Sequence, residues 1–186
     1  MATQQTLNIA NGIDMDALQK TIRMIKENPE LAKSKFHIRN KWLKGGHNQS
    51  TVSDFYCAGK NISHKQKFTV DADEPPILAG TDEGMNPVEH LLNALAACMT
   101  TSMVYHAAVN GINIEELESE LEGDLDLRGF IGLSDKIRKG YQNIRIKFKV
   151  KTDTENLQKL KDLVEFSPVF DVVSNGTNID IKVEKK

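Results

Sequence analysis

The sequence predicts an α+β protein, and three patterns lead to that class. One long segment, 86–110, is apolar around most of its circumference and begins with a helix-capping pattern. Segments on both sides of it alternate apolar with polar residues at the period of two that strands show. Because the strands come in groups, without regular β–α alternation, we expect two small antiparallel sheets around a long central apolar helix.

Length and composition exclude several classes of protein. The 186 residues suit one domain, with or without an added arm. The 24 Lys and Arg nearly balance the 26 Asp and Glu, whereas nucleic-acid binders are usually strongly basic, so we expect no nucleic-acid partner. No apolar run reaches the roughly 20 residues of a membrane span, and the first residues lack a secretory pattern. We therefore expect a cytoplasmic protein with no membrane partner.

The N-terminal part predicts a helical arm. Apolar residues recur at mostly helical intervals over 14–32, with Asp14 as a plausible cap and Asn28-Pro29 as a kink or break. The alternation characteristic of strands begins only at Lys35. We therefore divide the chain into an arm, 1–34, and a main domain, 35–186.

The next segments predict the first sheet. Alternation from Lys35 puts one set of side chains on one face and a basic set on the other: Phe36, Ile38 and Trp42 against His37, Arg39 and Lys41. A turn at 45–48 and short strands at 51–57 and 66–70 complete an antiparallel meander. The prolines and glycines of 71–84 indicate an irregular loop, and long loops in compact domains are often functional.

The central helix has the clearest signals. Asn86 is a suitable cap, Pro87 fits the first helical position, and Glu89 completes a capping box. Asn110-Gly111 is a suitable end, because glycine adopts the left-handed cap. A helix that is apolar on most sides needs cover on more than one face, so we expect a homodimer that buries the helices between shared sheets.

The last third predicts a second sheet and a final helix. Leucines alternate with Glu and Asp over 117–127, and apolar residues alternate with Lys and Arg over 144–151. These two strands can pair with opposite charges facing each other. A helix over 154–166, a turn at Asn175-Gly176 and a last strand over 177–183 complete the expected order.

The cysteines and histidines limit the chemistry. With only Cys57 and Cys98 there is neither a disulfide framework nor a CxxC motif. Cys98 lies in mid-helix, which by itself suits an inert buried thiol. His90 and His106 each lie eight residues from Cys98, whereas metal ligands on one helix are usually three or four apart. We therefore expect no metal and no cofactor.

Two stretches carry a family resemblance. The segment 73–80, Asp-Glu-Pro-Pro-Ile-Leu-Ala-Gly, is followed by 86–98, Asn-Pro-Val-Glu-His-Leu-Leu-Asn-Ala-Leu-Ala-Ala-Cys. Together they resemble the OsmC/Ohr family, in its OsmC-like branch, and the resemblance extends from about Lys35 to Val183. It implies an intertwined homodimer whose active sites lie at the subunit interface. It also implies a cysteine that attacks the hydroperoxide, an arginine and a glutamate that activate it, and a second cysteine that resolves the sulfenic acid.

Transferred residue by residue, the resemblance assigns three site residues. Cys98 matches the reactive cysteine, whose thiolate attacks the distal peroxide oxygen and becomes a sulfenic acid. Glu89 is the candidate glutamate, although its capping position already explains it and Val88 occupies the place where the hydroperoxidase branch usually has its glutamate. His47 stands in a Gly-Gly-His turn where that branch has Gly-Gly-Arg; it is either the activating cation or an ordinary turn residue. Arg39 is the nearest alternative cation.

The resolving cysteine is missing. Ser167 stands in Ser-Pro-Val where the family commonly has Cys-Pro-Val, and a serine cannot form the resolving disulfide. Cys57, at the end of a predicted strand, is not at that position. We therefore predict a one-cysteine, thiol-dependent peroxidase that reduces organic hydroperoxides with an external thiol reductant, as an antioxidant in the oxidative stress response. The alternative is a non-catalytic protein of the same fold that senses redox state or binds a small apolar ligand.

Overall fold

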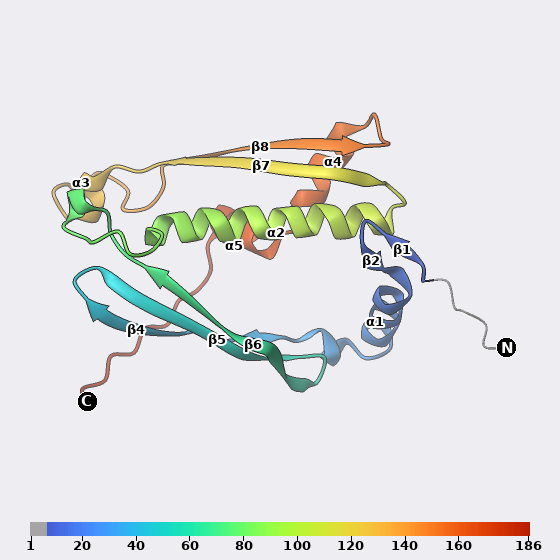
Figure 1. The fold of residues 1–186 in the computed structure, drawn as a ribbon, viewed down its shortest axis with the longest axis horizontal. Coiled ribbons are helices and arrows are strands. Elements are labelled where there is room, and N and C mark those ends of the chain that lie inside the picture. Colours follow the sequence, from blue (N-terminus) through green and yellow to red (C-terminus); the bar gives the residue numbers. More distant parts are fainter. Residues whose placement is uncertain (1–6) are drawn as a thin grey trace. The chain divides into compact units, whose positions relative to one another are not determined.

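A computed structural model describes residues 7–186, which form two compact units (Figure 1). The first unit extends to Leu91 and the second begins at Leu92, so the boundary falls within the long central helix. The predicted division between an arm, 1–34, and a main domain stays a prediction. Among the described residues, no helix combines the length and the apolar character that a membrane crossing requires.

The first unit begins with the predicted helical arm. Helix α1, Met15–Glu27, is capped by Asp14, whose carboxylate accepts a hydrogen bond from Ala17 N at 2.9 Å. It ends at Asn28, and the short 3-10 helix η1, Pro29–Ala32, follows. A hairpin of two short strands, β1 (Ile9–Ala10) and β2 (Ile13–Asp14), precedes the helix and was not predicted.

The main sheet of the first unit has four antiparallel strands. They are β3 (Lys35–Phe36), β4 (Arg39–Lys44), β5 (His47–Cys57) and β6 (Lys60–Ala72). β3 and β4 both pair with one edge of β5, and β6 pairs with its other edge. The strands β5 and β6 are longer than predicted, because β5 begins within the predicted turn and β6 includes the first residues of the predicted loop.

The two predicted faces of this sheet are present. On one face, Asn40 Nδ2 donates to Asn48 Oδ1 at 2.7 Å and to Ser50 Oγ at 2.9 Å, as alternation requires for even-numbered residues of β4 and β5. Large apolar residues of that face are exposed: Phe36 by 74%, Ile38 by 64% and Trp42 by 68%. The opposite face carries His37, Arg39 and Lys41.

The central helix begins and ends where the sequence predicted. Helix α2, Pro87–Val109, follows a loop that contains the 3-10 helix η2, Pro76–Leu78. Asn110 N and Gly111 N donate back to carbonyls of the last helical turn, and Gly111 has the left-handed φ of 68° that its end position predicted.

The second unit contains the predicted charge-paired strands. β7, Ile114–Asp124, pairs with β8, Asn143–Thr152, in an antiparallel ladder. Its register places four acidic residues opposite four basic ones: Glu116 with Lys151, Glu118 with Lys149, Glu120 with Lys147, and Glu122 with Arg145. The apolar face of this ladder packs on a core that includes Leu95, Met99 and Met103 of α2, and β7 and β8 extend alongside that helix in Figure 1.

Three short helices complete the second unit, and two predicted strand segments are wrong. The helices are α3 (Leu127–Phe130), α4 (Leu157–Val164) and α5 (Pro168–Asn175). The acidic strand ends at Asp124, because the Asp126 carboxylate accepts from Arg128 N and caps α3. Residues 177–183 form no strand, and Ile179, Ile181 and Val183 stay exposed, so their alternation gains no burial that would hold a strand in place.

Candidate functional site

Cys98 lies on a partly exposed face of α2. The thiol is free and half-buried. The buried core residues Leu95, Met99 and Met103 lie on the adjoining side of the helix, about 60–140° around its axis from Cys98. By the helical period of 3.6, Tyr105 lies two turns from Cys98 on nearly the same face, and it is exposed by 44%. Cys98 is therefore not enclosed in the core, which argues against the inert buried thiol.

The first turn of α2 is built by its capping box. Asn86 N donates to Glu89 Oε2 at 2.9 Å, and Val88 N donates to Asn86 Oδ1 at 3.0 Å. Glu89 lies nine residues before Cys98 on one continuous helix, a rise of about 14 Å and two and a half turns. Within one chain, the two side chains therefore leave opposite sides of the helix, and the carboxylate of Glu89 is occupied by the cap.

His47 is the most buried histidine of the described chain and lies between two carboxylates. Its Nε2 is 2.9 Å from Asp71 Oδ1, and its Nδ1 is 3.3 Å from Glu83 Oε2. Hydrogen bonds from His47 and Gln49 lower the pKa of Asp71, and Lys44 lowers that of Glu83. A protonated His47 ring donates to both carboxylates, so His47 is a positioned polar group rather than an exposed turn residue.

Asp73 organises the loop that leads to α2. Its side chain is 1% exposed and accepts hydrogen bonds from Glu74 N, Thr81 N, Thr81 Oγ1 and Glu83 N at 2.7–3.2 Å. The Thr81 hydroxyl is the largest cause that lowers the pKa of Asp73 to about 2, and the three backbone donors add to it. We call His47, Asp71, Asp73, Thr81 and Glu83 the loop cluster.

Glycine makes the close packing of this loop possible. A side chain at Gly80 would meet the Glu74 carbonyl oxygen at 1.7 Å, and one at Gly84 would meet the backbone of Asp71 at 2.6 Å. The first turn of α2 is joined to the end of β6 through His90, whose Nε2 is 3.1 Å from Asp71 O. The sequence predicted an irregular loop here but not the role of Asp73, because its four donors come from residues up to ten positions ahead.

Ser167, at the position of the expected resolving cysteine, has a structural role. It is 1% exposed and caps α5, with its hydroxyl accepting from Phe170 N at 3.1 Å. The second cysteine, Cys57, lies at the end of β5 in the first unit, where its sulfur accepts from Ser34 Oγ at 3.3 Å. Cys98 belongs to the second unit. The structure thus shows no resolving thiol in the place where the family pattern has one.

The remaining histidine on α2 makes an aromatic contact. His106 stacks on Phe166 with ring centroids 4.2 Å apart. The described residues contain no group of three or more His, Cys, Asp or Glu arranged to bind a metal ion.

An apolar cavity of about 390 Å³ lies in the second unit. It is bordered by α2, β8, α4 and α5, and its lining residues are mostly aliphatic and aromatic: Met99, Met103, Ile146, Phe148, Val150, Leu157, Leu160, Lys161, Val164, Glu165 and Phe170. Met99 follows Cys98 directly in the chain. A cavity of this size and lining suits a small apolar molecule.

Comparison with known proteins identifies the class of this fold. The profile of the OsmC-like protein family matches residues 80–182, more than half of the chain and the part that contains Cys98. The chain therefore belongs to the OsmC-like family, and the resemblance predicted from its sequence is confirmed.

Solved structures show the same fold at low identity. The OsmC-like protein of Mycoplasma pneumoniae is 18% identical with a TM-score of 0.58, covering 76% of this chain and 88% of that one. An OsmC-like protein of unknown function from Vibrio cholerae is 13% identical with a TM-score of 0.54, covering 78% of this chain and 94% of that one. No curated protein sequence matches the chain. The predicted α+β class with small antiparallel sheets is confirmed.

Proposed function

We propose that the chain is a one-cysteine, thiol-dependent hydroperoxide reductase that acts through Cys98. The observation that carries this proposal is the position of Cys98, half-buried on a face of the family's central helix that is not part of the core. The OsmC-like family supplies the reaction class, since the sequence resemblance implies a cysteine that attacks hydroperoxides. The buried cap role of Ser167 supports a cycle without an internal disulfide.

The proposed cycle uses one hydroperoxide and two external thiols. The Cys98 thiolate attacks the distal peroxide oxygen, the O–O bond breaks, and the alkoxide leaves and takes up a proton to become an alcohol. The resulting sulfenic acid reacts with one external thiol to give a mixed disulfide and water. A second external thiol then displaces the Cys98 thiolate and leaves as the oxidised disulfide.

His47 and Glu89 remain the proposed activating groups. His47 is held by two carboxylates, and Glu89 is held by the cap of α2. We expect His47→Gln to slow the oxidation of Cys98 by more than any loss of folded protein explains. Thermal unfolding of the same variant measures that loss. As an activating group, Glu89 requires that Glu89→Gln slow Cys98 oxidation. Because glutamine also completes a capping box, an unchanged oxidation rate would contradict that role.

We also propose that the protein is a homodimer. Two apolar surfaces are exposed: the sheet face with Phe36, Ile38 and Trp42, and the α2 face with Tyr105 and Val109. Exposed apolar patches of this kind usually mark contact surfaces. Analytical ultracentrifugation tests this proposal: the wild-type protein sediments as a dimer and Trp42→Lys shifts it toward monomer. A wild-type monomer at micromolar concentration contradicts the proposal.

The apolar cavity favours a second candidate function, the binding of a small apolar ligand without turnover. The cavity of about 390 Å³ has few polar groups in its wall. Native mass spectrometry of the purified protein distinguishes the two functions, since a co-purifying apolar ligand supports binding and Met103→Trp, which fills the cavity, would remove it.

The deciding experiment measures the oxidation rate of Cys98 in the Cys57→Ser background. Reduced protein is mixed with tert-butyl or cumene hydroperoxide, and sulfenic acid formation is followed across pH. The peroxidase proposal expects fast oxidation with an apparent pKa below the roughly 8.5 of a free thiol. Cys98→Ser is the control and should abolish the signal. Slow oxidation with the pH profile of a free thiol contradicts the proposal and leaves ligand binding.

A further inference from the structure

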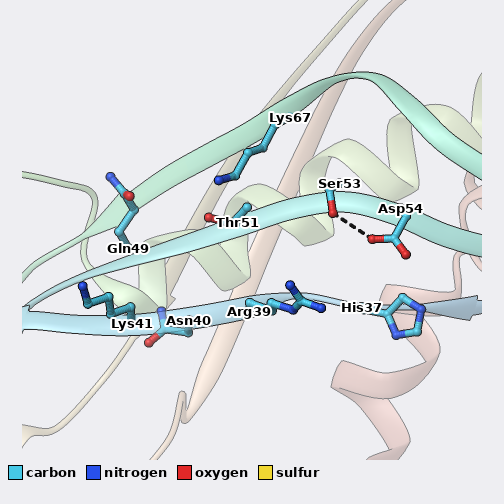
Figure 2. A pocket seen from close by; sticks show the side chains of 9 residues that line it. All are labelled: His37, Arg39, Asn40, Lys41, Gln49, Thr51, Ser53, Asp54 and Lys67. Carbon is cyan, nitrogen blue, oxygen red and sulfur yellow. Dashed lines mark hydrogen bonds between the residues drawn. The ribbon is translucent and has the colours of Figure 1, made fainter.

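The main sheet of the first unit carries a cavity of about 630 Å³ on its basic face (Figure 2). β4 borders one side and β6 the other, and β5 forms the floor between them. Arg39 and Lys41 extend from the first border, while Lys67 faces them from the second. Neutral side chains of β5, Gln49, Thr51 and Ser53, lie between the cations.

The cations of this cavity have no partner carboxylate. None of Arg39, Lys41 and Lys67 forms an ion pair with any residue that the structure describes. Asp54 is the single carboxylate among the residues lining the cavity, and it already accepts a hydrogen bond from Ser53 Oγ at 2.7 Å. The chain as a whole has a formal net charge of −2, so this positive charge is local.

The basic character continues on one side of the cavity. His37 lines it and also lines a neighbouring cavity with Lys33 and Lys35, which gives basic residues at every second position from 33 to 41, although Lys33 is paired with Glu30 at 2.7 Å. At the other end, Gln49 Nε2 donates to Asp71 Oδ1 at 3.1 Å. The Asp71 carboxylate that accepts this bond is also engaged by His47. The uncompensated charge therefore lies on the β4 and β6 sides.

We propose that this cavity binds a small organic phosphate with at least two negative charges. The guanidinium of Arg39 can bind two phosphate oxygens at once, and lysines act as point charges. Arg39 and Lys41, two residues apart on a strand, are separated by about 7 Å, and the two bordering strands by about 10 Å. Cations at such spacings fit separate charges of one ligand, and the Thr51 hydroxyl of the floor can donate to one of its oxygens.

The observations favour a small ligand over a nucleic acid. The volume of about 630 Å³ lies within the usual range of small-molecule sites. Proteins that bind single-stranded nucleic acid stack its bases on aromatic side chains, and the lining residues include no Phe, Tyr or Trp. The aromatic residues Phe36 and Trp42 belong to the opposite face of this sheet.

Calorimetric titration of the full chain with inorganic pyrophosphate tests the proposal. We expect saturable binding that weakens as salt is added, since the partly exposed cations are screened. Lys67→Gln and Arg39→Gln should each weaken binding by about three- to tenfold. Asp54→Asn should tighten it by about two- to threefold, because it removes the opposing charge. This gain of affinity cannot arise from a folding defect.

Lys60→Gln is the matched control. Lys60 lies at the hairpin end of β6, outside the cavity, and its substitution removes the same charge. Unchanged affinity in this variant supports the site. The proposal is overturned if pyrophosphate shows no saturable binding or if Lys60→Gln weakens it as much as Lys67→Gln. It is also overturned if citrate binds as tightly as pyrophosphate, or if a single-stranded oligonucleotide binds more tightly than both. These readouts do not involve Cys98.

Discussion

The two main sheets of this protein use the same alternation of apolar and charged residues to different ends. Four glutamates of β7 each face a basic residue of β8 across the ladder, and the other face packs on the core of the second unit. In the sheet of the first unit, Arg39 and Lys41 of β4 lie opposite the neutral Thr51 and Gln49 of β5, and the apolar face is exposed. Alternation therefore predicts a strand and its faces, whereas the partner strand decides whether charge is neutralised or left available for a ligand.

The largest expected difference concerns the apolar faces. Ile146→Ala in β8 removes a side chain packed against the core and should lower the free energy of unfolding by about 2–4 kcal/mol. Ile38→Ala in β4, where the residue is exposed, should change it by less than about 0.5 kcal/mol at low protein concentration. Urea unfolding measures both variants. A larger loss for Ile38→Ala that grows with protein concentration would show that a second copy covers this face.

A smaller difference is expected for charge reversal. Lys149→Glu places a carboxylate opposite Glu118 and should destabilise the protein by about 0.5–1 kcal/mol. Lys67→Glu places one among the unpaired cations Arg39 and Lys41, so stability should be unchanged or slightly higher. Thermal unfolding at low salt compares the two variants. Equal destabilisation by both would mean that Lys67 has a partner and would contradict the contrast.

The smallest expected difference is in how the pKa values of two carboxylates, Asp73 and Asp124, respond to salt. Neutral donors, led by the Thr81 hydroxyl, lower the pKa of Asp73 to about 2, whereas Arg145 lowers that of Asp124. Each depressed pKa stabilises the fold above the unfolded-state value near 3.8, and this contribution is lost as pH falls through the folded-state pKa. We expect 1 M salt to raise the pKa of Asp124 but to leave that of Asp73 nearly unchanged.

Carboxyl carbon shifts measured by NMR in a pH titration give both values. Thr81→Val is the control, since it removes the leading donor and should raise the pKa of Asp73 alone. Equal responses of the two groups to salt would show that a cation also acts on Asp73.

Local signals predicted much of the fold. The ends of α2 follow from Asn86, Pro87 and Glu89 within one turn, and the pairing of β7 with β8 follows from complementary charge and period. The prediction of a strand over 177–183 is wrong. Alternation is a property of one segment and does not indicate whether a sheet has a free edge with which that segment can pair. The strand predicted to continue to Leu127 failed because Asp126 caps a helix.

The site was predicted less completely than the fold. The motif around Cys98 makes it the candidate reactive residue, and that role stays a prediction. The loop cluster depends on contacts between His47, Asp71 and Glu83, which come from separate strands and a loop, so no local spacing indicates them. The basic cavity has the same origin, since Lys67 meets Arg39 and Lys41 only across two strand pairings.

The irregularity in β5 and β6 also has a consequence for how this sequence can change. The pairing between these strands shifts its register between Val52 and Asp54, and across the shift the rings of Phe36, Phe55, His64 and Phe68 contact one another in succession. Single replacements near Ser53 leave that alignment intact. Loss or gain of one residue there would invert the side chains that follow, up to Cys57. This stretch should therefore accept many substitutions over evolution but hardly any change in length.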